Sequence, residues 1–339
     1  MKKRIIFCAD GTWDTAQNDT NVYKIYKALT VASDQVAFYD DGVGSDGTPI
    51  EKLAGGAIGQ GIFQKIKDGY TRIAHVYEKD DEIFIFGFSR GAFTARSLAG
   101  MIAVCGLPTA AFDDALVEAA FRAYQYKSQR AAFLAEHPLD NAQIKMVGVW
   151  DTVGSLGVPA LFGGVDPLMD GFLDTSLHPD VHNAFHALAI DERRQEFPPT
   201  LYQLPQPPVA GQVLEQVWFS GVHCDVGGGY ADTALSDITM SWMLGKAMGL
   251  GLEVDPTVAK HYTNMDPKFA LGQIHESWSP LWLFPKWRSV PADAAVSNSV
   301  VIRYENVPVY RPHNIAFGKE GLAPARTEVP VVNPIPAQP

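Results

Sequence analysis

Short apolar runs alternate with amphipathic segments along most of the chain. The apolar runs are residues 4–9, 36–39, 82–88, 144–150 and 212–219. Their near-continuous hydrophobicity predicts strands buried on both faces. Segments with apolar residues at helical spacing are about 21–30, 58–77, 90–105, 109–137 and 237–248. Strands that alternate with helices predict an α/β fold with a mostly parallel central sheet and helices on both faces, like that of an α/β-hydrolase.

Three stretches interrupt this pattern. Residues 40–61 are rich in glycine, which predicts a loop over the sheet. Beyond residue 251 the pattern weakens into loops that carry a tryptophan cluster, and residues 330–339 hold four prolines and are expected to be frayed. Without an internal repeat or a clear linker, we predict a single domain over residues 1–329. Its insertions are expected at about 109–140, 154–185 and 251–300.

Composition and charge limit the partners and the cellular location that the protein is expected to have. The 339 residues include 27 Lys and Arg against 38 Asp and Glu, a net charge of −11 that disfavours nucleic acid as a partner. Cys8, Cys105 and Cys224 lie far apart, which suits a reducing cytosol. The apolar run after the basic N-terminus is too short for a signal peptide, and no segment is long enough to span a membrane. We expect a cytoplasmic protein, whose export would need a route without a cleaved signal.

The sequence Gly87-Phe88-Ser89-Arg90-Gly91 matches the Gly-x-Ser-x-Gly nucleophile elbow. An apolar strand runs directly into the motif and a helix follows it, which is the context that an exposed nucleophile needs. Ser89 is therefore the predicted nucleophile. Because Ser89 would begin the helix, the backbone N–H of Arg90 is expected to stabilise an oxyanion.

A catalytic serine needs an imidazole base and a carboxylate that orients it, in the chain order Ser, acid, His. Asp151 directly follows the apolar run 144–150, and His223 follows the run 212–219 in a glycine-rich loop. We assign them as acid and base, with His275 as the reserve base. His178, His182 and His186 fall four apart, as on one helix face. Pro179 and the missing Glu disfavour a metal site there, so a solvated or capping role is expected.

The turn after the first strand carries a second set of candidates. Backbone N–H groups of Gly11 and Thr12 are expected to complete the oxyanion hole, and Asp10, Trp13 and Phe88 are expected to contact the substrate. An alternative uses Asp10 and Asp225 as ligands of a hard cation in a metal-dependent phosphohydrolase. This alternative does not need Ser89. The preferred interpretation requires neither a metal nor another cofactor.

Several sequence blocks in fixed order together resemble a known family. They are residues 10–14, 21–22, 87–92, 149–153, 186–194 and 217–230. The chain resembles the α/β-hydrolase family that includes the catalytic domain of type VI secretion phospholipase effectors. The resemblance implies a triad at Ser89, Asp151 and His223 and cleavage of glycerophospholipid esters. Members of that family carry large additional regions for which this chain has no room.

We therefore predict a serine hydrolase that cleaves carboxylic esters through an acyl-enzyme, with phospholipid or other acyl esters as substrates. The alternatives are the metal-dependent phosphohydrolase and a binding protein on an inactive hydrolase scaffold. Trp278, Trp282 and Trp287 belong to an apolar segment that is either a lid or lipid contact, or a buried cluster under a loop. The first option would bring the protein into peripheral contact with a membrane.

Overall fold

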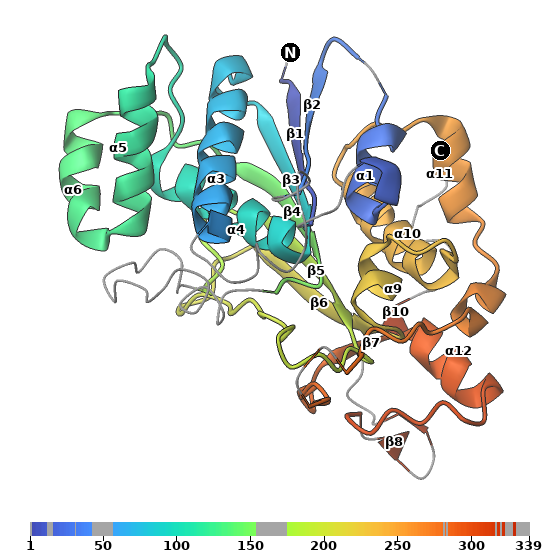
Figure 1. Ribbon diagram of the computed structural model, residues 1–339. Coiled ribbons are helices and arrows are strands. Elements are labelled where there is room, and N and C mark those ends of the chain that lie inside the picture. Colours follow the sequence, from blue (N-terminus) through green and yellow to red (C-terminus); the bar gives the residue numbers. More distant parts are fainter. Residues whose placement is uncertain are drawn as a thin grey trace.

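An eight-stranded, all-parallel sheet forms the centre of the molecule (Figure 1). The computed structural model describes residues 2–11, 16–30, 32–42, 57–153, 175–280, 282, 284–315, 317–318, 321–322 and 328–329. The strands of the sheet are β1 (Arg4–Ala9), β2 (Gln35–Asp40), β3 (Glu82–Phe88), β4 (Ile144–Trp150), β5 (Asn183–Ala189), β6 (Val213–Phe219), β7 (Ala295–Ser297) and β10 (Glu328–Val329). Their order is β10-β7-β6-β5-β4-β3-β1-β2, which confirms the predicted α/β fold.

Helices cover both faces of this sheet. They are α1 (Asn21–Ala28), α3 (Ala57–Val76), α4 (Ser89–Cys105), α5 (Asp114–Gln125), α6 (Lys127–Glu136), α9 (His223–Gly227), α10 (Ala234–Gly249), α11 (Pro256–Thr263) and α12 (Asn298–Asn306). Short 3-10 helices lie at Ala16–Asn18 and Pro267–Leu271, and β8 (Phe317–Gly318) pairs with β9 (Gly321–Leu322) in a separate hairpin. None of the helices in the described part of the chain is long and apolar enough to cross a bilayer.

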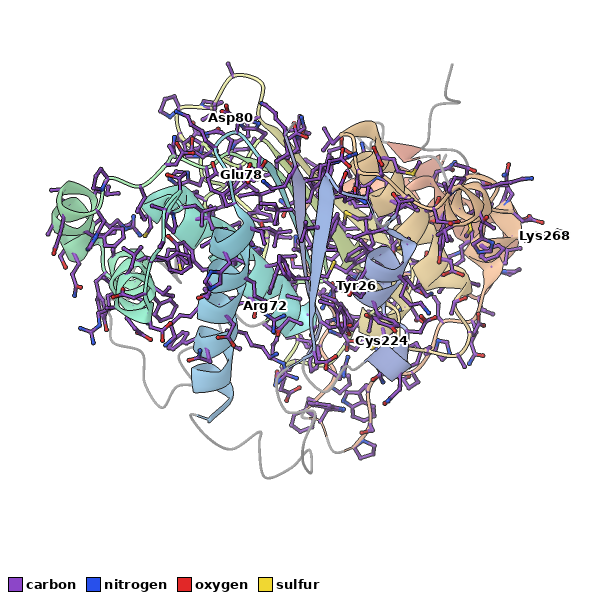
Figure 2. The ribbon with its side chains drawn as sticks, turned by 90° about the horizontal axis from the view of Figure 1, so that it is seen from above. Tyr26, Arg72, Glu78, Asp80, Cys224 and Lys268 are labelled. Atoms are coloured by element: carbon purple, nitrogen blue, oxygen red, sulfur yellow. The ribbon has the colours of Figure 1, made fainter. Side chains whose placement is uncertain are left out.

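Alternate side chains of each central strand enter opposite cores. Ile5 and Phe7 of β1 pack toward α3, α4 and α5, whereas Ile6 and Cys8 pack toward α1 and α10. Figure 1 shows these two helical layers on either side of the sheet. In Figure 2 Arg72 of α3 lies on one side of the sheet, and Tyr26 of α1 lies on the other together with Cys224. The near-continuous apolar sequence of the strands therefore reflects burial on both faces.

The strand order reverses between β1 and β3. Helix α1 leads from β1 to β2 on one face, while α3 leads from β2 to β3 on the other face. Such a reversal opens a crevice at the carboxyl ends of the two strands, where ligands of open α/β sheets bind. Asp10 follows β1 and Ser89 follows β3, so both lie at this point.

Four sequence expectations differ from the structure. Residues 183–189 form strand β5 rather than the helix suggested by the histidine spacing, because both faces of the segment are buried. His223 begins the short helix α9 rather than lying in a loop. The sheet continues past residue 219 through β7 and β10, and α11 and α12 lie in the segment expected as loops. Of the expected glycine-rich loop, residues 43–56 lie outside the described residues.

The turn from β3 into α4 depends on two glycines. A Cβ on Gly87 would lie 2.5 Å from the carbonyl oxygen of Gly91, and a Cβ on Gly91 would lie 2.3 Å from the carbonyl oxygens of Ala9 and Asp10. These contacts are with backbone atoms, which cannot rotate away. The two glycines of the motif therefore let α4 start directly against the end of β1.

We expect Gly91→Ala to destabilise the protein by about 1–3 kcal/mol, since the added methyl group has no room beside β1. Gly249→Ala is the matched control, because a Cβ at Gly249 meets no atom within 4 Å. Urea denaturation of both variants and the wild type measures the difference. Equal stability of the two variants would contradict the close approach of α4 to β1.

Candidate active site

A continuous hydrogen-bonded chain joins three residues that the sequence assigns to catalysis. Ser89 Oγ lies 2.8 Å from His223 Nε2, and His223 Nδ1 lies 2.5 Å from Asp151 Oδ2. All three side chains are buried. The structure therefore brings together a hydroxyl, an imidazole and a carboxylate in the arrangement that activates a nucleophile.

Parallel strands explain why residues so far apart in the sequence meet. Ser89, Asp151 and His223 follow the carboxyl ends of β3, β4 and β6, which lie at one edge of the sheet. Ser89 has φ = 58° and Asp151 has φ = 41°, both in the left-handed region that costs energy for residues with a side chain. The Asp151 N–H donates to the carbonyl of Ala187 at 2.7 Å, and the N–H of Ala189 donates to Asp151 Oδ1 at 2.9 Å, so neighbouring β5 holds this conformation.

Aromatic rings enclose the imidazole of His223. The Phe88 ring centroid lies 4.6 Å from that of His223 and the Phe197 centroid lies 5.0 Å away. Burial lowers the pKa of His223, and although Asp151 opposes this effect, the net direction is downward. The imidazole is therefore neutral at pH 7, as a general base must be.

Arg288 is a buried partner of Asp151 that the sequence analysis missed. Its Nη1 lies 2.6 Å from Asp151 Oδ1 and its Nη2 lies 2.9 Å from Asp151 Oδ2. Burial alone would raise the pKa of Asp151, but the charge of Arg288 and the hydrogen bond from His223 outweigh it and lower the pKa. No motif surrounds Arg288, so the sequence offers no signal for this contact.

A second ion pair, between buried Glu192 and partly buried Arg194, lies on the backbone side of His223. Glu192 Oε2 accepts from the His223 N–H at 3.2 Å and from Arg194 Nη2 at 2.9 Å, while Glu192 Oε1 accepts from Ser277 Oγ at 2.9 Å. The Arg194 guanidinium lies 3.6 Å from the ring centroid of Phe197. Burial opposes ionisation of Glu192, but the hydrogen bonds and charge of Arg194 lower its pKa to about 2. Both residues belong to the block 186–194, so the sequence held a signal for this pair.

Of the predicted oxyanion-hole residues, the structure describes Arg90, which directly follows Ser89, and Gly11, which lies two residues after the end of β1. Arg90 is in the first turn of α4, where backbone N–H groups have no acceptor within the helix. The Gly11 N–H donates to Asp10 Oδ1 at 2.8 Å, and Thr12 and Trp13 lie outside the described residues. A role of Gly11 as oxyanion donor would require this N–H to exchange its acceptor.

Two hydroxyl groups contact Asp10 in addition to the Gly11 N–H. Thr20 Oγ1 lies 2.6 Å and the Tyr39 hydroxyl 2.7 Å from Asp10 Oδ2. Burial raises the pKa of Asp10, and these hydrogen bonds oppose the rise without reversing it. Phe88 is buried as well and packs against the imidazole of His223. Contact of these two residues with substrate stays a prediction.

Asp225, the other carboxylate of the metal alternative, has separate partners. Its Oδ1 lies 2.6 Å from His275 Nδ1, and its Oδ2 accepts from the Val222 N–H at 3.0 Å and the His275 N–H at 3.1 Å. The His275 ring stacks on Tyr230 at 3.9 Å. The reserve base is thus engaged with Asp225. Within the described residues, no three His, Cys, Asp or Glu side chains gather as a metal site.

The three histidines spaced four apart do not share a helix face. His186 is buried on β5, where its Nε2 accepts from the Thr152 N–H at 3.1 Å, so the expected solvated role is wrong for this residue. Burial, followed by the charge of Arg96, lowers the pKa of His186 to about 3. His186 therefore serves as a neutral structural acceptor behind the Asp151 turn.

We expect Glu192→Gln to lower the free energy of unfolding at pH 7 by on the order of 3 kcal/mol. Because the folded-state pKa of Glu192, about 2, lies below its ordinary value of 4.5, the ion pair stabilises the protein above pH 4.5 and loses its effect as the pH falls toward 2. The variant should therefore lose less stability than the wild type across this range. Denaturant titrations at several pH values measure this.

Glu82→Gln is the matched control, since its ion pair with Lys145 is partly exposed and contributes below about 1 kcal/mol. Equal pH dependence of the wild type and Glu192→Gln would contradict a buried, ionised Glu192.

Comparison with known proteins gives the family. A family model described as "T6SS, Phospholipase effector Tle1-like, catalytic domain" matches residues 3–246. An uncharacterized protein of Saccharomyces cerevisiae is 30% identical over 227 residues, which cover 58% of this chain and 32% of that protein.

Two solved structures are also similar. The crystal structure of an uncharacterized protein from Pseudomonas aeruginosa has 17% identity and a TM-score of 0.45, and the match covers 79% of this chain and 48% of that one. The structure of the Tle1 effector bound to the VgrG spike from the type 6 secretion system has 19% identity and a TM-score of 0.39, with 68% and 52% covered. This chain thus spans about a third of the curated relative and about half of each solved chain. The match over residues 3–246 confirms the resemblance: the chain belongs to the family of Tle1-like catalytic domains of type VI secretion phospholipase effectors.

Proposed function

We propose that the protein is a serine hydrolase that cleaves carboxylic esters of lipids. The observation that carries this proposal is the unbroken chain from Ser89 through His223 to Asp151 at the carboxyl edge of the sheet. Membership of a phospholipase effector family supports lipid esters as the substrate class. No specific observation favours the metal-dependent phosphohydrolase.

The geometry suggests a two-step reaction. His223 Nε2 takes the proton of Ser89 Oγ as this oxygen attacks the ester carbonyl, and Asp151 holds the other ring nitrogen protonated. Backbone N–H groups of Arg90 and of the Gly11–Thr12 turn would stabilise the oxyanion. The imidazolium then protonates the leaving alcohol. Water, activated by the same imidazole, releases the acid from the acyl-enzyme.

The apolar segment 278–287 suits contact with a lipid surface. Phe284 is 85% exposed and Trp287 is 41% exposed, and Lys286 between them is exposed as well. Trp282 packs on Phe197 at a centroid distance of 5.6 Å, and Phe197 contacts His223. The segment thus exposes two large aromatic side chains at its outer end, residues 284–287, while Trp282 is connected to the imidazole of His223 through Phe197. We assign the outer end to peripheral contact with a bilayer rather than to a buried cluster.

A cytoplasmic location is part of the proposal. Cys8, Cys105 and Cys224 are all free thiols, which suits a reducing compartment. The family name associates related domains with type VI secretion, so export without a cleaved signal is the corresponding route for an effector role.

We expect Ser89→Ala to reduce kcat/KM for short- and long-chain acyl esters by about 10³-fold or more, because the nucleophile is lost. Ser97→Ala, a buried serine two turns further along α4, is the matched control and should keep wild-type rates. Each protein is assayed with and without EDTA. Activity that survives in Ser89→Ala and disappears in EDTA would overturn the serine mechanism in favour of the Asp10 and Asp225 alternative.

We expect Phe284→Ser to weaken binding to phosphatidylglycerol-containing vesicles at least severalfold while leaving hydrolysis of a soluble short-chain ester unchanged. Loss of a large apolar side chain from the lipid-facing end removes burial worth about 1.5–3 kcal/mol. Leu134→Ser is the control, because Leu134 is 47% exposed on α6, on the α3 side of the sheet (Figure 1). Equal vesicle binding by both variants in a co-sedimentation assay would contradict the assignment.

A further inference from the structure

Arg288 binds the turn at Asp151 through four acceptors. Nη1 donates to Asp151 Oδ1 at 2.6 Å and to the carbonyl of Ala189 at 2.8 Å. Nη2 donates to Asp151 Oδ2 at 2.9 Å and to the carbonyl of Phe197 at 2.8 Å. The guanidinium is buried, and the two terminal nitrogens together have four hydrogens for these four bonds. Arg288 therefore fixes the orientation of the Asp151 carboxylate through both of its oxygens, one of which also contacts His223 Nδ1.

The same contacts change the charge that His223 faces. A lone buried carboxylate would strongly favour the charged imidazolium, whereas Asp151 shares its charge with a cation. On its backbone side His223 faces Glu192, which is likewise paired with Arg194. The groups around the imidazole are thus two acid–arginine pairs, the neutral hydroxyl of Ser89, and the rings of Phe88 and Phe197.

We propose that Arg288 is a positioning residue of the site, which aims one carboxylate oxygen of Asp151 at His223 and offsets its negative charge so that His223 remains a neutral base into mildly acidic solution. The catalytic consequence rests on the proposed function, whereas the effect on the imidazole does not. Arg288 directly follows Trp287, so the residue that holds the Asp151 carboxylate comes immediately after the apolar segment 278–287.

A purely structural anchor predicts something different. If Arg288 only tied its segment to the carbonyls of Ala189 and Phe197, removing it would lower stability without changing the titration of His223. Arg303 provides the matched comparison: it is also buried, and its Nη1 donates to the carbonyls of Ala270 at 2.9 Å and Gly272 at 2.6 Å.

The experiment is a histidine NMR titration of ¹⁵N-labelled wild type, Arg288→Lys, Arg288→Met and Arg303→Met, with His223 signals assigned by their loss in His223→Gln. We expect Arg288→Met to raise the titration midpoint of His223 by about one pH unit, since a cation near the imidazole is lost. Arg288→Lys should stay near wild type because it keeps the charge, and Arg303→Met should not move the midpoint. Thermal melts identify any variant that fails to fold, in which case Arg288→Gln replaces Arg288→Met.

The same variants are then assayed for hydrolysis of an acyl ester. We expect the acid limb of kcat/KM to move to higher pH in Arg288→Met and kcat to fall by about 10²-fold as the carboxylate loses its orientation. In an Asp151→Asn background, Arg288→Met should have little further effect on kcat, because Arg288 acts through Asp151.

An unchanged His223 midpoint in folded Arg288→Met would overturn the proposal, as would an equal shift in Arg303→Met. A shifted midpoint in a protein that hydrolyses no ester would retain the role of Arg288 toward His223 and reject the proposed function. A shifted midpoint with the matching kinetic change would support both.

Discussion

The close contact between the start of α4 and the end of β1 is the constraint on which this site depends. Gly91 lies where a Cβ would be 2.3 Å from two backbone oxygens, so the helix begins directly against the strand. The chain makes this entry through a left-handed residue, Ser89, at a cost of about 1–3 kcal/mol that the buried β3 and α4 must offset. This conformation places the serine hydroxyl at the carboxyl ends of the strands, at the point where the strand order reverses.

Charge compensation is the second organising feature. Asp151 and Glu192 are both buried, and each is paired with its own arginine, Arg288 and Arg194. Unpaired, either carboxylate would carry a large desolvation penalty. The two pairs approach His223 from its ring and backbone sides, while Phe197 packs against its ring. The imidazole therefore has a fixed position, and the negative charges near it are each offset by an arginine. Its three hydrogen-bonding neighbours, Ser89, Asp151 and Glu192, come from distant parts of the chain.

The sequence predicted the features that depend on residues close together along the chain, such as the buried strands. The apolar runs gave β1, β3 and β4 to within a residue, because strands buried on both faces need continuous hydrophobicity. Blocks in fixed order predicted the family, and the family match over residues 3–246 confirmed it. The strand ends bring Ser89, Asp151 and His223 within hydrogen-bonding distance, although their catalytic role stays a prediction. Strand β5 was missed because histidines four apart imitate a helix face. Arg288 could not be found, since its contact with Asp151 joins residues 137 positions apart and leaves no local pattern.

Covalent trapping of the nucleophile tests the central claim most directly. The protein is incubated with an alkyl fluorophosphonate at pH 7, digested and analysed by mass spectrometry. The account predicts one modified peptide, with the phosphonyl group on Ser89, and greatly slowed labelling in His223→Ala because the activating base is absent. Modification of another residue, or equally fast labelling of Ser89 without His223, would contradict the assignment of Ser89 and His223 as nucleophile and base.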